Sequence, residues 1–158
     1  MLLNARPTIF EDECLSSYLY RLAYANAHAS GNVYARKLGM TVSNINNNEF
    51  SEQAVKTLSE MTCYPPPELK KHTAIQQEKR SKEESPLRRR MRFCPLCLGE
   101  NRYHRSAWNL NWNTVCLKHG IMLKDKCECG RITSLHSVMI NGCLSCGKAL
   151  IRETAKKG

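Results

Sequence analysis

Aspartate is scarce in this chain: Asp12 and Asp125 are the only two among 158 residues, and neither belongs to a plausible carboxylate cluster. An enzyme that transfers phosphoryl groups with two metal ions needs such a cluster to hold them. The His-x-Glu motif of zinc deaminases and the His-Glu-x-x-His motif of metalloproteases are also missing. We therefore expect a protein without catalytic residues.

The chain also lacks a functional phosphate-binding loop. Gly142-x4-Gly147-Lys148 has the spacing of such a loop, but Ala149 stands where a serine or threonine would bind magnesium. Two cysteines inside this segment are better assigned as metal ligands, as described below. We expect any ATPase activity to belong to a partner.

Long apolar runs are missing as well. No segment approaches the ~20 apolar residues that a membrane-spanning helix needs. The apolar start of the sequence ends at Leu3 and is followed at once by Asn4 and Arg6, unlike a secretory signal. We expect a cytoplasmic protein with no membrane partner.

Cysteine is abundant by contrast, and seven of the nine cysteines lie in one third of the chain. With one histidine they form four close pairs: Cys94/Cys97, Cys116/His119, Cys127/Cys129 and Cys143/Cys146. Two ligands this close in sequence reach one metal ion from a single tight turn. We predict two structural zinc ions, the first held by Cys94, Cys97, Cys116 and His119 and the second by Cys127, Cys129, Cys143 and Cys146.

Two alternatives stay open at this stage. A disulfide framework suits a small secreted protein, but cysteines of one tight turn are poor disulfide partners in a reducing cytosol. An interleaved arrangement would join the first pair to the third, whereas the sequential arrangement that we favour needs only short loops. Either arrangement fills all four coordination positions, so we expect closed, structural sites. Their metal would supply the folding free energy that this segment, poor in large apolar residues, lacks.

Positive charge is concentrated in the second half of the chain. Residues 1–75 carry seven basic and seven acidic side chains, whereas residues 76–158 carry seventeen and seven and so supply the entire net charge of +10. Residues 76–92 have little to bury and form a predicted basic linker. It ends in four arginines that could bind phosphates: Arg88, Arg89, Arg90 and Arg92. A solvated charged surface is the alternative.

Residues 1–75 have helical patterns. Apolar side chains form one stripe from Leu15 to Ala23, and Ser51 and Pro66 are placed to begin two further helices. The asparagine-rich run 44–48 has no apolar period and is predicted to be a loop. The two later helices suggest a helix-turn-helix whose second helix would present Lys70, Lys71 and His72 to DNA. A surface for docking another protein is the other role that we consider for this unit.

Several single residues have simpler expected roles. His104 should pack against Tyr103 and Trp108 with its ring nitrogens hydrogen-bonded, rather than serve as a spare ligand. Trp108 and Trp112 are expected in the core of ribbon strands, with exposed stacking on RNA bases as the alternative. The remaining two cysteines, Cys14 and Cys63, are expected to be buried as small apolar side chains.

The residues around the first metal ligands form a longer pattern: Phe93-Cys94-Pro95-Leu96-Cys97-Leu98, then Tyr103-His104-Arg105 with Trp108, then Val115-Cys116-Leu117-Lys118-His119-Gly120. In this order they resemble the TniQ family of transposition target-selection proteins. The segment Leu15 to Ala23, preceded by Pro7 and by Glu11-Asp12-Glu13, is similar to that family's opening helix. Cys14 departs from the family pattern, in which a serine is expected.

Together these patterns predict a small α+β fold. Residues 1–75 would form a helical, helix-turn-helix-like domain, 76–92 the linker, 93–122 the first zinc finger, and 123–158 the second zinc finger and tail. The resemblance implies a bacterial, non-catalytic adaptor in RNA-guided DNA transposition. Such an adaptor links an AAA+ ATPase regulator (TnsC-like) assembled on DNA to a CRISPR effector with its guide RNA.

The length of the chain resembles the compact members found in type V-K systems more than those associated with Cascade. Whether the chain also contacts RNA or DNA directly stays open. The alternative function is a sequence-specific DNA-binding transcriptional regulator with a helix-turn-helix and zinc ribbons.

Overall fold

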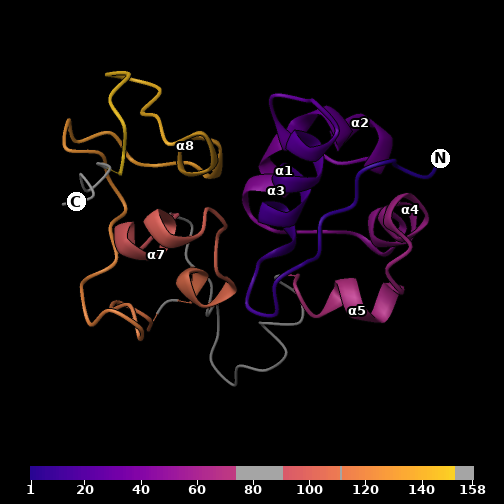
Figure 1. Cartoon of the computed structure of the whole chain (residues 1–158), viewed down its shortest axis with the longest axis horizontal. Helices are drawn as coiled ribbons and strands as arrows, with labels where there is room; N and C mark the ends of the chain where they lie inside the picture. The colour runs from indigo at the N-terminus through magenta and orange to yellow at the C-terminus, as the bar shows by residue number, and fades with distance from the viewer. Residues whose placement is uncertain (74–90, 111, 152–158) are drawn as a thin grey trace, which may run out of the picture.

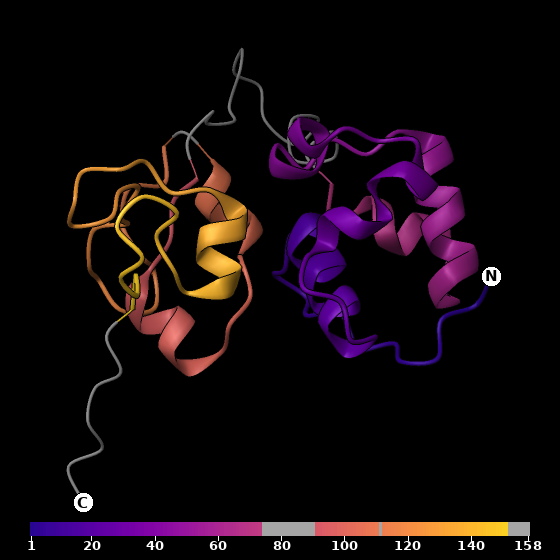
Figure 2. The same ribbon diagram turned by 90° about the horizontal axis from the view of Figure 1, so that it is seen from above.

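Two lobes pack side by side in the computed structural model, which describes residues 1–73, 91–110 and 112–151 (Figures 1 and 2). We call residues 1–73 the helical lobe and residues 91–110 and 112–151 the metal lobe. Most of the predicted basic linker, including Arg88, Arg89 and Arg90, lies outside the described residues, as does the tail from residue 152.

The helical lobe contains five α-helices and one 3-10 helix: α1 (Leu15–Ala25), η1 (Gly31–Tyr34), α2 (Ala35–Leu38), α3 (Val42–Asn46), α4 (Glu52–Thr62) and α5 (Pro66–Lys70). The apolar stripe of α1 is buried as predicted. Ser51 caps α4, since its side chain accepts the backbone N–H of Ala54 at 3.1 Å. Gly39 ends α2 with a φ of 62°, a left-handed conformation that suits glycine.

Helix α3 corrects part of the prediction of a loop over residues 44–48: residues 44–46 are helical, whereas residues 47 and 48 form a turn. Thr41 and Asn44 form a reciprocal cap, in which each backbone N–H is accepted by the other residue's side chain at 3.1 Å. Ile45 is fully buried and fixes this short helix against the core. The asparagine-rich run has no apolar period that would indicate a helix. One buried apolar residue and a cap are nevertheless enough when tertiary packing supplies the rest of the stability.

The predicted DNA-reading face of α5 is only partly formed. The helix has five residues. Lys70 pairs with Glu52 at 3.3 Å and Lys71 with Glu68 at 2.9 Å, and both lysines remain accessible. The prediction that His72 faces a groove is wrong, because its ring is buried and Nδ1 donates to the Glu13 carbonyl at 2.7 Å.

The metal lobe contains α7 (Pro95–Glu100), a 3-10 helix η2 (Ser106–Asn109) and α8 (Leu135–Ile140). Across the described residues, β structure is limited to isolated bridges such as Val115 with Met122, so the fold is mostly helical rather than the α+β fold expected. Trp108 lies in η2 and is buried. Trp112 is 53% exposed, so its predicted core role is wrong.

Backbone and core contacts join the lobes. Glu13 and Arg105 form an antiparallel bridge, and the backbone N–H of Cys14 donates to the His104 carbonyl at 3.0 Å. Helix α8 faces the helical lobe (Figure 2), where Leu135 and Met139 belong to the core of that lobe. Val138 of the same helix packs into the core of the metal lobe. The segment predicted as a second zinc finger thus completes the helical core.

Candidate metal centres

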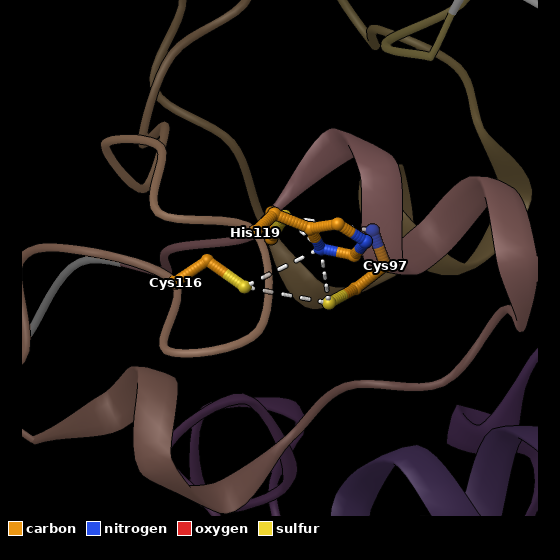
Figure 3. A group of neighbouring side chains, drawn as sticks. Cys97, Cys116 and His119 are labelled. Atoms are coloured by element: carbon orange, nitrogen blue, oxygen red, sulfur yellow. Dashed lines mark hydrogen bonds between the residues drawn. The ribbon is translucent and has the colours of Figure 1, made fainter.

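The first cluster brings together Cys94, Cys97, Cys116 and His119, whose ligand atoms all lie within 4.8 Å of one another. The Nδ1 atom of His119 lies 3.5, 3.3 and 3.6 Å from the sulfurs of Cys94, Cys97 and Cys116. The sulfurs of Cys97 and Cys116 are 3.5 Å apart, and Figure 3 shows these side chains converging. The three cysteines are buried and the histidine is half-buried.

These separations fit a tetrahedral metal ion. Bonds of ~2.3 Å to sulfur and ~2.0 Å to nitrogen give tetrahedral edges of about 3.8 Å between sulfurs and about 3.5 Å between sulfur and nitrogen. A disulfide would need sulfurs only ~2.05 Å apart, and all nine cysteines are free. The cluster can therefore hold a metal ion in a closed four-ligand shell, and the sequential grouping of the pairs is the one that the structure forms.

Two tight turns position these ligands. Cys94 precedes α7 as its N-cap residue, and its sulfur accepts the backbone N–H of Cys97 at 3.5 Å. The second pair lies in a turn closed by the N–H of Gly120, which donates to the Cys116 carbonyl at 2.8 Å. Gly120 has a φ of 65°, so a residue with a side chain would strain this turn.

The local environment shifts the pKa values of the thiols of the first cluster in opposite directions. Burial and the neighbouring thiols raise the pKa of Cys97 to about 12. Burial also raises the pKa of Cys116, but hydrogen bonds from His119 and from the other two cysteines outweigh it and lower that pKa to about 7. A divalent cation would stabilise all three thiolates, because metal coordination requires the deprotonated form.

Glu100, at the end of α7, fixes the orientation of the histidine. Its carboxylate accepts the Nε2–H of His119 at 2.8 Å and also pairs with Lys118. With Nε2 protonated, Nδ1 keeps the lone pair that faces the three sulfurs. Carboxylates that hold metal-binding histidines in this way strengthen metal affinity. The cysteine spacing provided no indication of this residue, since it lies outside the ligand pairs.

Glu100→Ala should weaken metal retention at the first cluster by about 10- to 100-fold and leave the second cluster unchanged. Glu100→Gln keeps an acceptor oxygen without the charge. Its metal affinity at the first cluster should lie between that of the parent and that of Glu100→Ala. Titration of the metal-loaded protein with a competing chromophoric chelator measures both affinities, with the exposed Glu60→Gln as control. Equal retention in all four proteins would show that the carboxylate has no influence on the metal.

The second cluster contains Cys127, Cys129, Cys143 and Cys146, again with all ligand atoms within 4.8 Å. Sulfurs of Cys127 and Cys146, and of Cys129 and Cys143, are 3.7 Å apart, close to the tetrahedral edge of about 3.8 Å. Backbone N–H groups of Cys146 and Ser145 lower the pKa of the Cys143 thiol to about 6. Cys129 and Cys146 are exposed, unlike any cysteine of the first cluster.

The segment from Tyr103 to Trp108 joins the first cluster to the helical lobe. His104 is fully buried: Nε2 donates to the Arg92 carbonyl at 2.8 Å, and Nδ1 accepts from the thiol of Cys14 at 3.5 Å. Burial lowers its pKa to about 3, with a smaller contribution from Arg105. The ring also packs edge-on against Trp108. The predicted structural roles of His104 and of buried Cys14 are confirmed.

The side chain of Arg105 also stabilises the segment from Tyr103 to Trp108. Its guanidinium lies over the Tyr103 and Trp108 rings and donates to the carbonyl of the metal ligand Cys97 at 3.4 Å. The Tyr103 hydroxyl donates to Asp12 of the helical lobe at 2.7 Å. The contact between Tyr103 and Asp12 was not predicted, because nothing in the local sequence pairs residues so far apart.

Of the other predicted contact residues, the structure describes Lys70, Lys71 and Arg92. Lys70 and Lys71 lie at the end of α5 in the helical lobe, and the guanidinium of Arg92 donates to the Asn113 carbonyl at 2.8 Å. Cys63 is exposed, contrary to its predicted burial, and ends α4 with a φ of 65°. It contacts the Arg6 guanidinium at 3.2 Å and neither cluster.

The structure defines a class of protein: a small, mostly helical protein with two closed four-ligand clusters, of which the first is joined to the helical lobe by residues 103–108. The TniQ family model matches residues 5–123, about three quarters of the chain. The chain therefore belongs to the TniQ family, which is associated with target selection in transposition. The match covers the first cluster and ends before the second.

A comparison with curated proteins gives no match. In the part of the chain that the structure describes, no helix is both long and apolar enough to span a membrane.

Proposed function

We propose that the chain is a non-catalytic adaptor for target-site selection in RNA-guided DNA transposition. It docks on an AAA+ ATPase regulator assembled on DNA and connects it to a CRISPR effector with its guide RNA, in a system of the type V-K kind. Two zinc ions hold its metal lobe in shape. The observation that carries this proposal is the match of the TniQ family to the helical lobe and first cluster together.

The donor sets favour zinc in both clusters. A shell of three cysteines with one histidine, or of four cysteines, suits zinc when its spacing is tetrahedral, whereas magnesium and calcium prefer oxygen ligands. Because protein ligands fill each shell, no position stays open for a substrate or an activated water molecule. The metals therefore serve the fold, and function depends on the surfaces that the fold presents.

Features of α5 weaken the alternative of a sequence-specific DNA reader. The helix is short, and the lysines at its end, Lys70 and Lys71, are each paired with a carboxylate. His72, the third proposed contact, is buried. A reading helix instead needs several side chains free to reach base edges in the groove.

Retention of the chain on immobilised ATPase regulator tests the adaptor proposal. We expect strong retention when nucleotide and duplex DNA are both present, and weak retention when either is omitted. The chain alone should bind DNA weakly, without sequence preference and with a salt-dependent affinity. Selection of one duplex sequence by the purified chain at physiological salt would support the DNA-reader function and contradict the adaptor.

The same assay tests the proposed nucleic-acid or partner contacts. Glutamine substitutions at Arg88, Arg89, Arg90 and Arg92, or at Lys70 and Lys71, identify which group contributes to retention. Arg92 also supports the fold through Asn113, so the triple variant without it is the cleaner comparison. Unchanged retention would mark these residues as a solvated surface.

A further inference from the structure

The two clusters differ in how exposed their cysteine residues are. In the first cluster Cys94, Cys97 and Cys116 are between 0% and 4% exposed. In the second cluster Cys129 and Cys146 are exposed, and Cys127 and Cys143 are buried. Oxidants react with a thiolate only where they can reach the sulfur, so the second cluster presents the more reactive pair.

The clusters also differ in the support that surrounds them. The first includes a histidine held by Glu100 and a cysteine whose carbonyl accepts from Arg105. The second has four sulfur ligands and no histidine. Since a neutral histidine is not oxidised by mild peroxide as a thiolate is, the first cluster has one fewer susceptible ligand.

Helix α8 lies in the chain between the two ligand pairs of the second cluster. Its Leu135 is fully buried and its Met139 is 2% exposed within the core of the helical lobe, and Val138 is buried in the core of the metal lobe. The Tyr20 hydroxyl lies 3.3 Å from Nδ1 of His136. This six-residue helix is too short to be stable alone, so its position depends on packing and on the closed ligand pairs at both ends.

From these observations we propose that the second cluster is an oxidation-sensitive metal site that controls how firmly α8 joins the two lobes. The proposal rests on zinc occupancy as proposed above, and does not depend on the adaptor role. The oxidant in this proposal is a peroxide, which reacts with the thiolates of the exposed cysteines. The first cluster keeps its metal under the same conditions.

The reaction is a two-electron oxidation. The sulfur of an exposed cysteine, Cys129 or Cys146, attacks one peroxide oxygen, and the O–O bond breaks to leave a sulfenic acid and, after protonation, one water molecule. A neighbouring thiolate 3.7 Å away, Cys143 or Cys127, attacks that sulfur and releases the second water. Two thiolates, one hydrogen peroxide and two protons thus give one disulfide and two waters, and the metal ion loses two ligands.

After oxidation one disulfide, Cys129–Cys143 or Cys127–Cys146, still links the two ends of the α8 segment, but no metal holds the other two cysteines. The disulfide also draws its sulfurs from 3.7 Å to ~2.05 Å, which rearranges the turns on both sides of α8. The apolar contacts of Leu135, Val138 and Met139 then have to hold the helix without the four-ligand shell. We expect the backbone amides of 135–140 to exchange faster with solvent, and those of α1 that pack beneath them to follow in part.

Limited hydrogen peroxide added to the zinc-loaded full chain tests the proposal. A colorimetric chelator follows zinc release, alkylation with mass spectrometry locates the oxidised cysteines, and hydrogen exchange reports on α8. Zinc content before oxidation is measured separately, so an empty starting protein would count against zinc binding rather than against this inference. Cys63→Ser removes the exposed thiol outside the clusters and serves as the background.

We expect about one zinc per chain to be released first, with oxidation confined to the four cysteines of the second cluster and faster exchange over 135–140. Reduction with added zinc should reverse all three changes. Simultaneous release of both metals, earlier oxidation of the first cluster, or unchanged exchange over α8 after release would each overturn the proposal.

Discussion

Cys97→Ser should reduce the zinc content from two ions per chain to one and unfold the region around the first cluster. Serine offers a hydroxyl that stays protonated and binds zinc poorly, so the four-ligand shell is lost. Structural zinc contributes an apparent binding free energy of about 10–16 kcal/mol. That contribution is as large as the net stability of a typical domain, about 5–15 kcal/mol. Elemental analysis and far-UV circular dichroism measure the two effects.

Matched variants separate the metal effect from the effect of losing any cysteine. Cys63→Ser replaces an exposed cysteine outside both clusters and should keep two zinc ions and the parent spectrum. Cys129→Ser should lose one zinc as well, but from the second cluster. Retention of two zinc ions and full structure by Cys97→Ser would contradict the assignment of Cys94, Cys97, Cys116 and His119 as one shell.

Loss of the metal from the first cluster should also destabilise the packing against the helical lobe. Residues 103–108 lie between the ligands Cys97 and Cys116, and His104 contacts both Cys14 and Ser17 of the helical lobe. Removal of the metal therefore releases the segment that the N-terminal end of α1 packs against. We expect Cys97→Ser to abolish retention by the ATPase regulator, because the lobes no longer present one joined surface.

Sequence spacing predicted what depends on local geometry. The ligands of each pair are two or three residues apart, so each pair is fixed by a single turn, and the structure brings all eight together as grouped. The cap at Ser51 is likewise local and is found where predicted. The main apolar stripe of α1 is present because its spacing matches the helical period.

Features that depend on distant contacts could not be predicted. Nothing near His72 indicates that its ring would donate to the carbonyl of Glu13, which lies 59 residues earlier. Trp112 has the large, mostly apolar side chain typical of a core residue but lies exposed, because burial of a residue is decided by the packing of other segments. The role of α8 in both cores was missed for the same reason: a six-residue helix has too few positions to show which faces are buried.

Glu13 is the clearest case of a residue whose importance is visible only in the folded chain. Its side chain is fully buried beside α1, where its carboxylate accepts from the Ser17 hydroxyl at 2.9 Å and the Phe10 N–H at 3.2 Å. Arg21 lies 2.7 Å from it and is 19% exposed. In the sequence Glu13 was one of three acidic residues before a helix; in the structure it is the buried anion at the junction of the lobes.

Arg21→Met should lower the free energy of unfolding by about 3–5 kcal/mol, the usual cost of leaving one partner of a buried ion pair uncompensated. Methionine keeps much of the apolar stem of the arginine, whose guanidinium lies over Phe10, so the lost charge dominates. Glu13→Gln with Arg21→Met removes both charges and should recover most of the loss. Urea denaturation of the zinc-loaded proteins gives the four values of the cycle.

The pH dependence of this loss provides the decisive check. Burial raises the pKa of Glu13 above its ordinary value even though Arg21 lowers it, so without Arg21 the folded-state pKa should rise further. A raised folded-state pKa means that the folded chain binds the proton more tightly than the unfolded chain, and its stabilising effect is lost as pH rises through that pKa. The deficit of Arg21→Met relative to the parent should therefore be larger at pH 7.5 than at pH 5.5. Comparing each variant with the parent at the same pH cancels the shared effect of acid on the metal ligands. A deficit independent of pH, or no recovery in the double variant, would show that Glu13 is not held as a buried anion.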